Sequence, residues 1–323
     1  MKKTITAKNT IDVCIFLGIL FVILAFLSQL VKPDFGEVYN IVQVTEKLHS
    51  FEEEVPDTID VVFAGNSEVY RSFSPLQIFK ETGITSFLLS DSALRLCDAA
   101  VLIRTSFDSQ TPAVVVLEAD TIFSDAYTHK DGYALPTNFI EDILPIFHYH
   151  TVYKASHPEN IFVSADPKEK NHALRGFVET KEAVPYTGPA DYMGVGDPVG
   201  INEESKKYLA EIRKLCEEKN VPLVLVAAPN AKNWTYSKNE ALTEYAEKYG
   251  IDFIDLNMHL DDMGIDWETD TMDGGNHMSF EGSKKTTGFI EEYLRDNFDL
   301  PDHRGDPKYS GWEKDIKELG LYP

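Results

Sequence analysis

The residues with the clearest chemical potential are a serine and a histidine in distant parts of the chain. Ser67 ends the segment Val-Val-Phe-Ala-Gly-Asn-Ser, an apolar, β-branched run that closes on a turn. His277 follows Asp273 and two glycines, directly before an amphipathic stretch. A serine nucleophile, a histidine base and an acid that orients the base are the groups that acyl-transfer chemistry needs. The sequence therefore predicts catalysis by these three residues, provided that the fold brings the two segments together.

Each segment alone also has an ordinary structural interpretation. An Asn-Ser turn after a strand is a good helix N-cap, and a histidine near the start of a helix is often a surface or capping residue. The segment is not a G-x-S-x-G nucleophile elbow either, because residue 69 is valine. The joint pattern favours catalysis, since the serine follows the first predicted strand and the acid and histidine precede the last helix.

Short apolar runs alternate with helical patterns along most of the chain, which predicts an α/β fold. Strands are expected at 59–64, 84–89, 113–117, 222–228 and 251–255, and helices at 75–82, 92–106, 203–220, 239–249 and 280–298. Such alternation indicates a parallel sheet covered by helices on both faces. Ligands in these folds bind beyond the carboxyl ends of the strands. Ser67, Asp120 and Asn230 each follow a predicted strand, so we expect them at that edge.

The N-terminal region contains an uncharged apolar stretch, residues 13–31, about as long as a bilayer core when helical. Lysines precede it and acids soon follow, so the positive-inside rule places residues 1–12 in the cytoplasm and the main domain outside. A cleaved signal peptide is the alternative. The stretch is longer than a usual signal-peptide core and no A-x-A site follows. We therefore expect a single-pass, uncleaved signal anchor in the cell membrane.

Beyond this anchor, the pattern divides the chain into a stalk at 32–57, an α/β domain at 58–300 and a tail at 301–323. Residues 121–200 interrupt the alternation and are expected to form an insertion rich in Tyr, His, Pro and Gly.

The net charge of −23, from 53 acidic and 30 basic residues, argues against nucleic-acid binding. Cys97 and Cys216 are interpreted as small core residues, with a bond between them as the minor alternative.

No cofactor or metal is expected from the remaining motifs. The i, i+2 spacing of His148 and His150 does not place both rings on one helix face, so this segment and nearby His157 are interpreted as non-ligating. The acidic loop around Asp266, Glu268 and Asp270 is interpreted as solvated rather than cation-binding. Whether certain aromatic residues form a sugar-stacking wall or ordinary packing is left open; these are Tyr186, Tyr192, Trp234 and Tyr236.

The order of the chemical segments resembles that of the SGNH/GDSL hydrolase superfamily, which carries its serine after the first strand and an acid–histidine pair near the C-terminus. The segments FAGNSEVYRSFSP, VLVAAPN and DGGNHMSFEGSKKTTGFI are similar to blocks of a membrane-anchored subgroup. That subgroup includes the D-alanyl-lipoteichoic acid biosynthesis protein and alginate O-acetyltransferase accessory proteins. The resemblance covers most of residues 57–298 and implies a flavodoxin-like sheet.

The resemblance also implies roles for individual residues. Ser67 would be the nucleophile, His277 the general base and Asp273 the orienting acid, with the Ser67 backbone N–H as one oxyanion donor. This chain departs from the family at the second block, where Ser90 stands in place of a glycine. The asparagine of the third block is absent from the segment LEAD at 117–120, so Asn230 or Asn66 would substitute. The family spacing is Asp-x-x-His, whereas Asp273 lies four residues before His277; Asp270 is therefore a further candidate.

The function that the resemblance implies is ester hydrolysis or acyl transfer on a cell-envelope polysaccharide or teichoic acid, outside the cytoplasmic membrane. The acyl group would be O-acetyl or D-alanyl, and the partner a membrane-bound O-acyltransferase. The alternative is a non-catalytic scaffold or glycan-binding partner of the same machinery. The missing asparagine and the shifted aspartate favour that alternative, whereas the intact Ser67 and His277 favour an enzyme.

Overall fold

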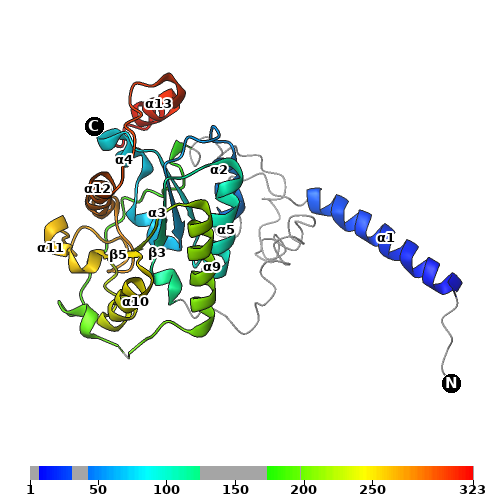
Figure 1. Cartoon of the computed structure of the whole chain (residues 1–323), viewed down its shortest axis with the longest axis horizontal. Coiled ribbons are helices and arrows are strands. Elements are labelled where there is room, and N and C mark those ends of the chain that lie inside the picture. The colour runs from blue at the N-terminus through cyan, green and yellow to red at the C-terminus, as the bar shows by residue number, and fades with distance from the viewer. Residues whose placement is uncertain (1–6, 31–42, 124–172, 197, 323) are drawn as a thin grey trace. The chain divides into compact units, whose positions relative to one another are not determined.

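The computed structural model describes residues 7–30, 43–123, 173–196 and 198–322. They fall into two units, one containing helix α1 (Ala7–Leu30) and the other the α/β domain (Figure 1). Helix α1 includes all but the last residue of the predicted membrane segment. Among the described residues, however, none of the helices combines the length and apolar character needed to cross a membrane. The signal anchor and its orientation therefore remain predictions.

The domain is built on one five-stranded parallel sheet with the order β2-β1-β3-β4-β5. The strands are β1 (Val61–Gly65), β2 (Ser86–Ser90), β3 (Val114–Glu118), β4 (Leu223–Ala227) and β5 (Asp252–Asp255). The first four are buried along their whole length, as expected for strands covered on both faces. The direction of winding reverses at β1, and the carboxyl end of the strand at such a switch point is where ligands of parallel sheets bind. The predicted parallel sheet is confirmed.

Helices cover both faces of this sheet, as the sequence predicts (Figure 1). One face carries α2 (Gln43–Glu52), α5 (Leu96–Ser109) and α9 (Glu203–Lys219), and the other carries α3 (Ser67–Ser72), α4 (Pro75–Thr82) and α12 (Phe280–Asn297). The remaining helices in the described part of the domain are α10 (Tyr236–Tyr249), α11 (Leu260–Met263) and α13 (Ser310–Leu319). Short 3-10 turns occupy Asp120–Ile122, Tyr192–Gly194, Leu256–Met258 and Pro307–Tyr309. Helix α5 begins later than predicted because Ala93, with φ 52°, breaks the helical path.

Helix α2 lies in the segment for which the sequence predicts a stalk. Its Phe51 is fully buried and packs edge-on against Phe87 of β2, with ring centroids 5.1 Å apart. Lys47 is also buried, and its Nζ donates to the carbonyl of Ser90 at 2.7 Å. Residues 43–52 therefore pack onto the sheet instead of forming a stalk, because their apolar positions find a partner in β2.

The last segment of the chain also packs onto the domain rather than extending as a tail. Trp312 of α13 is buried and stacks on Phe79 of α4, with ring centroids 5.0 Å apart. Tyr322 is buried, and its hydroxyl donates to Ser74 Oγ.

Of the predicted insertion, residues 124–172 lie outside the described residues, whereas Phe177 lies in the core. The remaining domain boundaries stay predictions.

Candidate active site

Ser67 lies at the carboxyl end of β1, as the first residue of α3. Asn66 is the N-cap of this helix, and its Oδ1 accepts a hydrogen bond from the backbone N–H of Glu68 at 3.0 Å. Gly65 has φ 153°, and a Cβ added there would lie 2.6 Å from Cβ of Glu118. Only glycine therefore allows β1 to pass this close to β3 before the turn. The Asn-Ser turn is both a helix cap and the position of the predicted nucleophile.

The segment that carries His277 is a tight loop held by backbone contacts. Gly274 and Gly275 have φ values of 77° and 102°, which side chains with a Cβ rarely adopt. A Cβ on Gly275 would also lie 2.7 Å from Cδ2 of Tyr186. The N–H of Gly275 donates to Oγ1 of Thr271 at 2.6 Å, which closes the loop. The two glycines thus fold the chain back so that an acid and a histidine four positions apart face each other.

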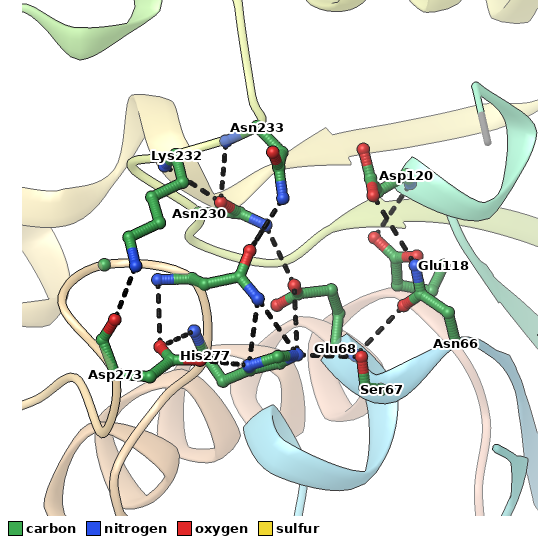
Figure 2. A network of polar contacts seen from close by, with 12 residues as sticks. Asn66, Ser67, Glu68, Glu118, Asp120, Asn230, Lys232, Asn233, Asp273 and His277 are labelled. Carbon is green, nitrogen blue, oxygen red and sulfur yellow. Dashed lines mark hydrogen bonds and ion pairs between the residues drawn. The ribbon is translucent and has the colours of Figure 1, made fainter. Parts of the chain in front are cut away.

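The structure brings the three predicted catalytic residues into contact (Figure 2). Ser67 Oγ lies 2.8 Å from Nε2 of His277, and Nδ1 of His277 lies 2.6 Å from Oδ2 of Asp273. The other carboxylate oxygen of Asp273 accepts the backbone N–H of His277 at 2.9 Å. An imidazole whose Nδ1–H donates to a carboxylate presents a lone pair on Nε2, so Ser67 can donate its hydroxyl proton there.

The electrostatics of Asp273 suit this arrangement. Burial alone would raise its pKa, but hydrogen bonds from the His277 side chain and backbone lower the pKa below its ordinary value of 3.8. Asp273 is therefore a carboxylate that fixes the ring orientation of His277. The His277 side chain is 20% exposed, so part of it is accessible to solvent.

Asn230, the predicted oxyanion donor, uses its amide group for other contacts. Its Nδ2 donates to Oε1 of Glu68 at 2.8 Å and to Oδ1 of Asn276 at 3.4 Å. Its Oδ1 accepts the backbone N–H groups of Lys232 and Asn233. Asn230 therefore belongs to the site, but the structure aims its amide at Glu68 rather than at a position beside Ser67.

The other candidates raised by the sequence have different surroundings. Ser90 ends β2 opposite Gly65, and its buried hydroxyl has no hydrogen-bond partner among the described residues. Its role as an oxyanion donor stays a prediction. Asp270 is buried and forms an ion pair with Lys285 at 2.5 Å, so it braces the loop against α12 and does not orient His277.

Two site residues were missed by the sequence analysis, Glu68 and Asn276. The Asn276 Nδ2 lies 3.0 Å from Nδ1 and 3.3 Å from Nε2 of His277. Comparable distances to both ring nitrogens place this amide over the face of the imidazole. Its Oδ1 accepts from Nδ2 of Asn233 at 2.6 Å. Neither residue has a signal in a single sequence, because each acts through a contact that only the fold creates.

Further acids lie around Ser67. Glu118 accepts the backbone N–H of Asp120 at 2.8 Å and that of Thr121 at 3.1 Å. Burial, followed by the negative charge of Asp120, raises the pKa of Glu118 from 4.5 to about 8. Asp120 itself forms an ion pair with Lys238 of α10 at 2.7 Å. Several acidic side chains therefore lie near Ser67, at the carboxyl ends of β1 and β3.

The remaining motifs are not built as binding sites. Trp234 is buried and donates its Nε1–H to Asp255 at 2.7 Å, and the Tyr192 hydroxyl donates to Asn257 at 2.9 Å. Both are core residues and not part of a sugar-stacking wall. In the described part of the chain, no three side chains are grouped to hold a metal ion. The predicted histidine motif at 148–157 lies outside that part.

No protein-family model and no curated protein matches the chain. Among solved structures it is similar to a GDSL-like lipase from Bacteroides thetaiotaomicron, with 14% identity and a TM-score of 0.41, over 79% of this chain and 100% of that one. It is also similar to a family 3 carbohydrate esterase from Clostridium thermocellum, with 13% identity and a TM-score of 0.37, over 74% of this chain and 96% of that one. A lipase/acylhydrolase from Enterococcus faecalis has 9% identity and a TM-score of 0.36, over 75% of this chain and 98% of that one. At these values the likeness assigns neither a family nor an activity.

Proposed function

We propose that this chain is a serine-dependent acyl-transfer enzyme that hydrolyses an ester or passes its acyl group to another hydroxyl. The observation that supports this most directly is the continuous hydrogen-bonded line from Ser67 Oγ through His277 to Asp273, with distances of 2.8 Å and 2.6 Å. A nucleophile, a base and an orienting acid in this order are what acyl transfer through a covalent intermediate requires.

In the first half-reaction, Oγ of Ser67 attacks the ester carbonyl carbon while Nε2 of His277 takes the hydroxyl proton. As the first residue of α3, Ser67 has a backbone N–H with no intrahelical acceptor, and this group would bind the oxyanion. His277 then protonates the leaving alcohol, which leaves an acyl group on Ser67. Water or an acceptor hydroxyl, deprotonated by His277, attacks the acyl carbonyl and regenerates the serine.

The proposed setting is the outer face of the cytoplasmic membrane. The acceptor or ester would belong to a cell-envelope polysaccharide or teichoic acid, the acyl group would be O-acetyl or D-alanyl, and the partner would be a membrane-bound O-acyltransferase. These details rest on the sequence resemblance and on the apolar N-terminal stretch at 13–31. The acyl group and the choice between hydrolysis and transfer depend on the substrate that reaches Ser67.

A second candidate function is a non-catalytic scaffold or glycan-binding protein of the same machinery. One observation favours it: the amide of Asn230 donates to Glu68 and Asn276 and is therefore not aimed at an oxyanion beside Ser67. Loss of one oxyanion donor typically costs about 3 kcal/mol of transition-state stabilisation. A scaffold would need neither the nucleophile nor the base.

Labelling of the full-length protein with a fluorophosphonate probe distinguishes the two functions. We expect the wild type to be labelled and Ser67→Ala to be unlabelled, because the probe reacts with activated serines. Ser310→Ala, an exposed serine at the start of α13, is the control and should be labelled like the wild type. A folded wild type that takes no label would favour the scaffold.

A further inference from the structure

His277 has a carboxyl group near each of its ring nitrogens (Figure 2). Asp273 lies at Nδ1, and Oε1 of Glu68 lies 3.9 Å from Nε2, the atom that takes the proton of Ser67. Glu68 directly follows the nucleophile and is only 3% exposed. Its Oε1 accepts from Asn230, and its Oε2 has no hydrogen-bond partner in the described part of the chain. The acyl-transfer mechanism does not use this carboxyl group.

The charge of Glu68 would matter for the base. A carboxylate this close to Nε2 would stabilise the imidazolium form of His277 relative to the free base, by a factor of about ten or more. Protonated His277 cannot accept the hydroxyl proton of Ser67. The fraction of His277 that is unprotonated near neutral pH, and can act as the base, is therefore larger if Glu68 carries no charge.

The surroundings of Glu68 disfavour a charge. Three acids face it from neighbouring elements: Glu118 on β3, Asp120 in the following turn and Asp273 in the histidine loop. The two nearby lysines are engaged elsewhere, since Lys238 pairs with Asp120 and Lys232 donates to the Asp273 carbonyl. A buried carboxylate without a cationic partner is costly. Burial first, and then the charges of the three acids, raise the pKa of Glu68 well above its ordinary value of 4.5.

We propose that Glu68 is a neutral carboxylic acid in the resting site, and that its lack of charge keeps His277 available as the base. The inference rests on the proposed acyl-transfer function, for which His277 must be unprotonated. Glu68 acts through His277 and is therefore a positioning residue rather than a catalytic one. Asn230 holds it in place through the hydrogen bond from Nδ2 to Oε1.

Substitutions at Glu68 and Asp120 test this through the pH–rate profile of ester hydrolysis. Glu68→Gln cannot ionise and keeps an oxygen that can accept from Asn230, so the acid limb of its profile should lie at the same pH as in the wild type. Asp120→Asn removes an acid that faces Glu68 and leaves the Lys238 charge unpaired. Because one of the charges that raise the pKa of Glu68 is then gone, Glu68 should ionise at a lower pH, and the acid limb should move up by up to about one pH unit. The double variant should return to the wild-type profile.

The return of the double variant to the wild-type pH–rate profile is the decisive result, because a purely structural effect of Asp120→Asn would persist in the double variant. Glu291→Gln is the matched control. Burial and the charge of Glu81 raise the pKa of Glu291 to about 8, but this acid lies on α12 and should leave the profile unchanged. The proposal is wrong if Glu68→Gln moves the acid limb down by about one pH unit, as removal of a negative charge beside Nε2 would, or if the double variant keeps the shifted limb.

Infrared difference spectroscopy tests the charge state without relying on activity. The wild type minus Glu68→Gln spectrum at neutral pH should contain the C=O stretch of a protonated carboxylic acid. Carboxylate bands alone would overturn the inference. If the wild type fails to react with the fluorophosphonate probe, the proposed function fails, whereas the infrared band reports on Glu68 in either case.

Discussion

At the scale of residues, the spacing of the acid and histidine shows what one sequence can and cannot reveal. Asp273 lies four positions before His277 instead of the three that the resemblance leads one to expect, yet it reaches Nδ1 at 2.6 Å. The two intervening glycines, both with positive φ, make this possible. The residue types and the approximate spacing were predictable, whereas the contact between Asn230 and Glu68 was not, because it joins two elements distant in sequence.

Asp273→Asn should reduce the rate of ester hydrolysis by on the order of a thousandfold while the fold is retained. An asparagine amide can donate to Nδ1, which favours the tautomer with a proton on Nε2, and that tautomer cannot accept from Ser67. Steady-state kinetics on an activated ester would measure the effect. Asp266→Asn, in the same loop but outside the triad, is the control. A loss of less than about tenfold would show that Asp273 does not orient the base.

At the scale of elements, the strands and long helices could be predicted because their apolar periodicity is strong. The Asn-Ser turn indicates a helix cap, but the helix that follows it, α3, is not among the predicted helices, since it has only six residues and four of them are buried. The packing of α2 and α13 was not predicted either. Their amphipathic patterns show that each buries one face, but a sequence does not say that the partners are β2 and α4.

The turn after β1 makes a specific prediction about Gly65. Gly65→Ala should lower the free energy of unfolding by about 1–3 kcal/mol, because the added Cβ would meet Glu118 and Val69 in a well-packed region. The displacement should also slow the labelling of Ser67. Gly288→Ala on α12 is the control: its added Cβ meets nothing within 4 Å, and it should raise stability by about 0.5–1 kcal/mol. Urea unfolding measures both, and equal stabilities would contradict the steric account.

At the scale of the whole molecule, acidity dominates. The chain carries a net charge of −23, and several of its acids lie close to the nucleophile. The sign of the charge could be obtained from composition, but its concentration around Ser67 could not, because Glu68, Glu118 and Asp120 converge there only in the folded sheet.

These buried acids predict how stability depends on pH. The carboxyl group of Glu118 has its ordinary pKa of 4.5 in the unfolded chain and a pKa of about 8 in the fold. The folded state therefore keeps the proton between these two pH values, whereas the unfolded state loses it. Stability should therefore fall as pH rises from about 4.5 to about 8. Thermal unfolding at constant ionic strength would show a Tm that is lower at pH 8 than at pH 5. A Tm that rises over this range would contradict the assignment of neutral buried acids.

The most direct test of the central claim is detection of the acyl-enzyme. Incubation of the full-length protein with p-nitrophenyl acetate, followed by acid quench and peptide mass spectrometry, should find an acetyl group on Ser67. We expect no such adduct in Ser67→Ala and a strongly reduced rate of formation in His277→Gln. Absence of an acetyl group on Ser67 in the folded wild type, or acetylation that forms equally fast without His277, would contradict the account.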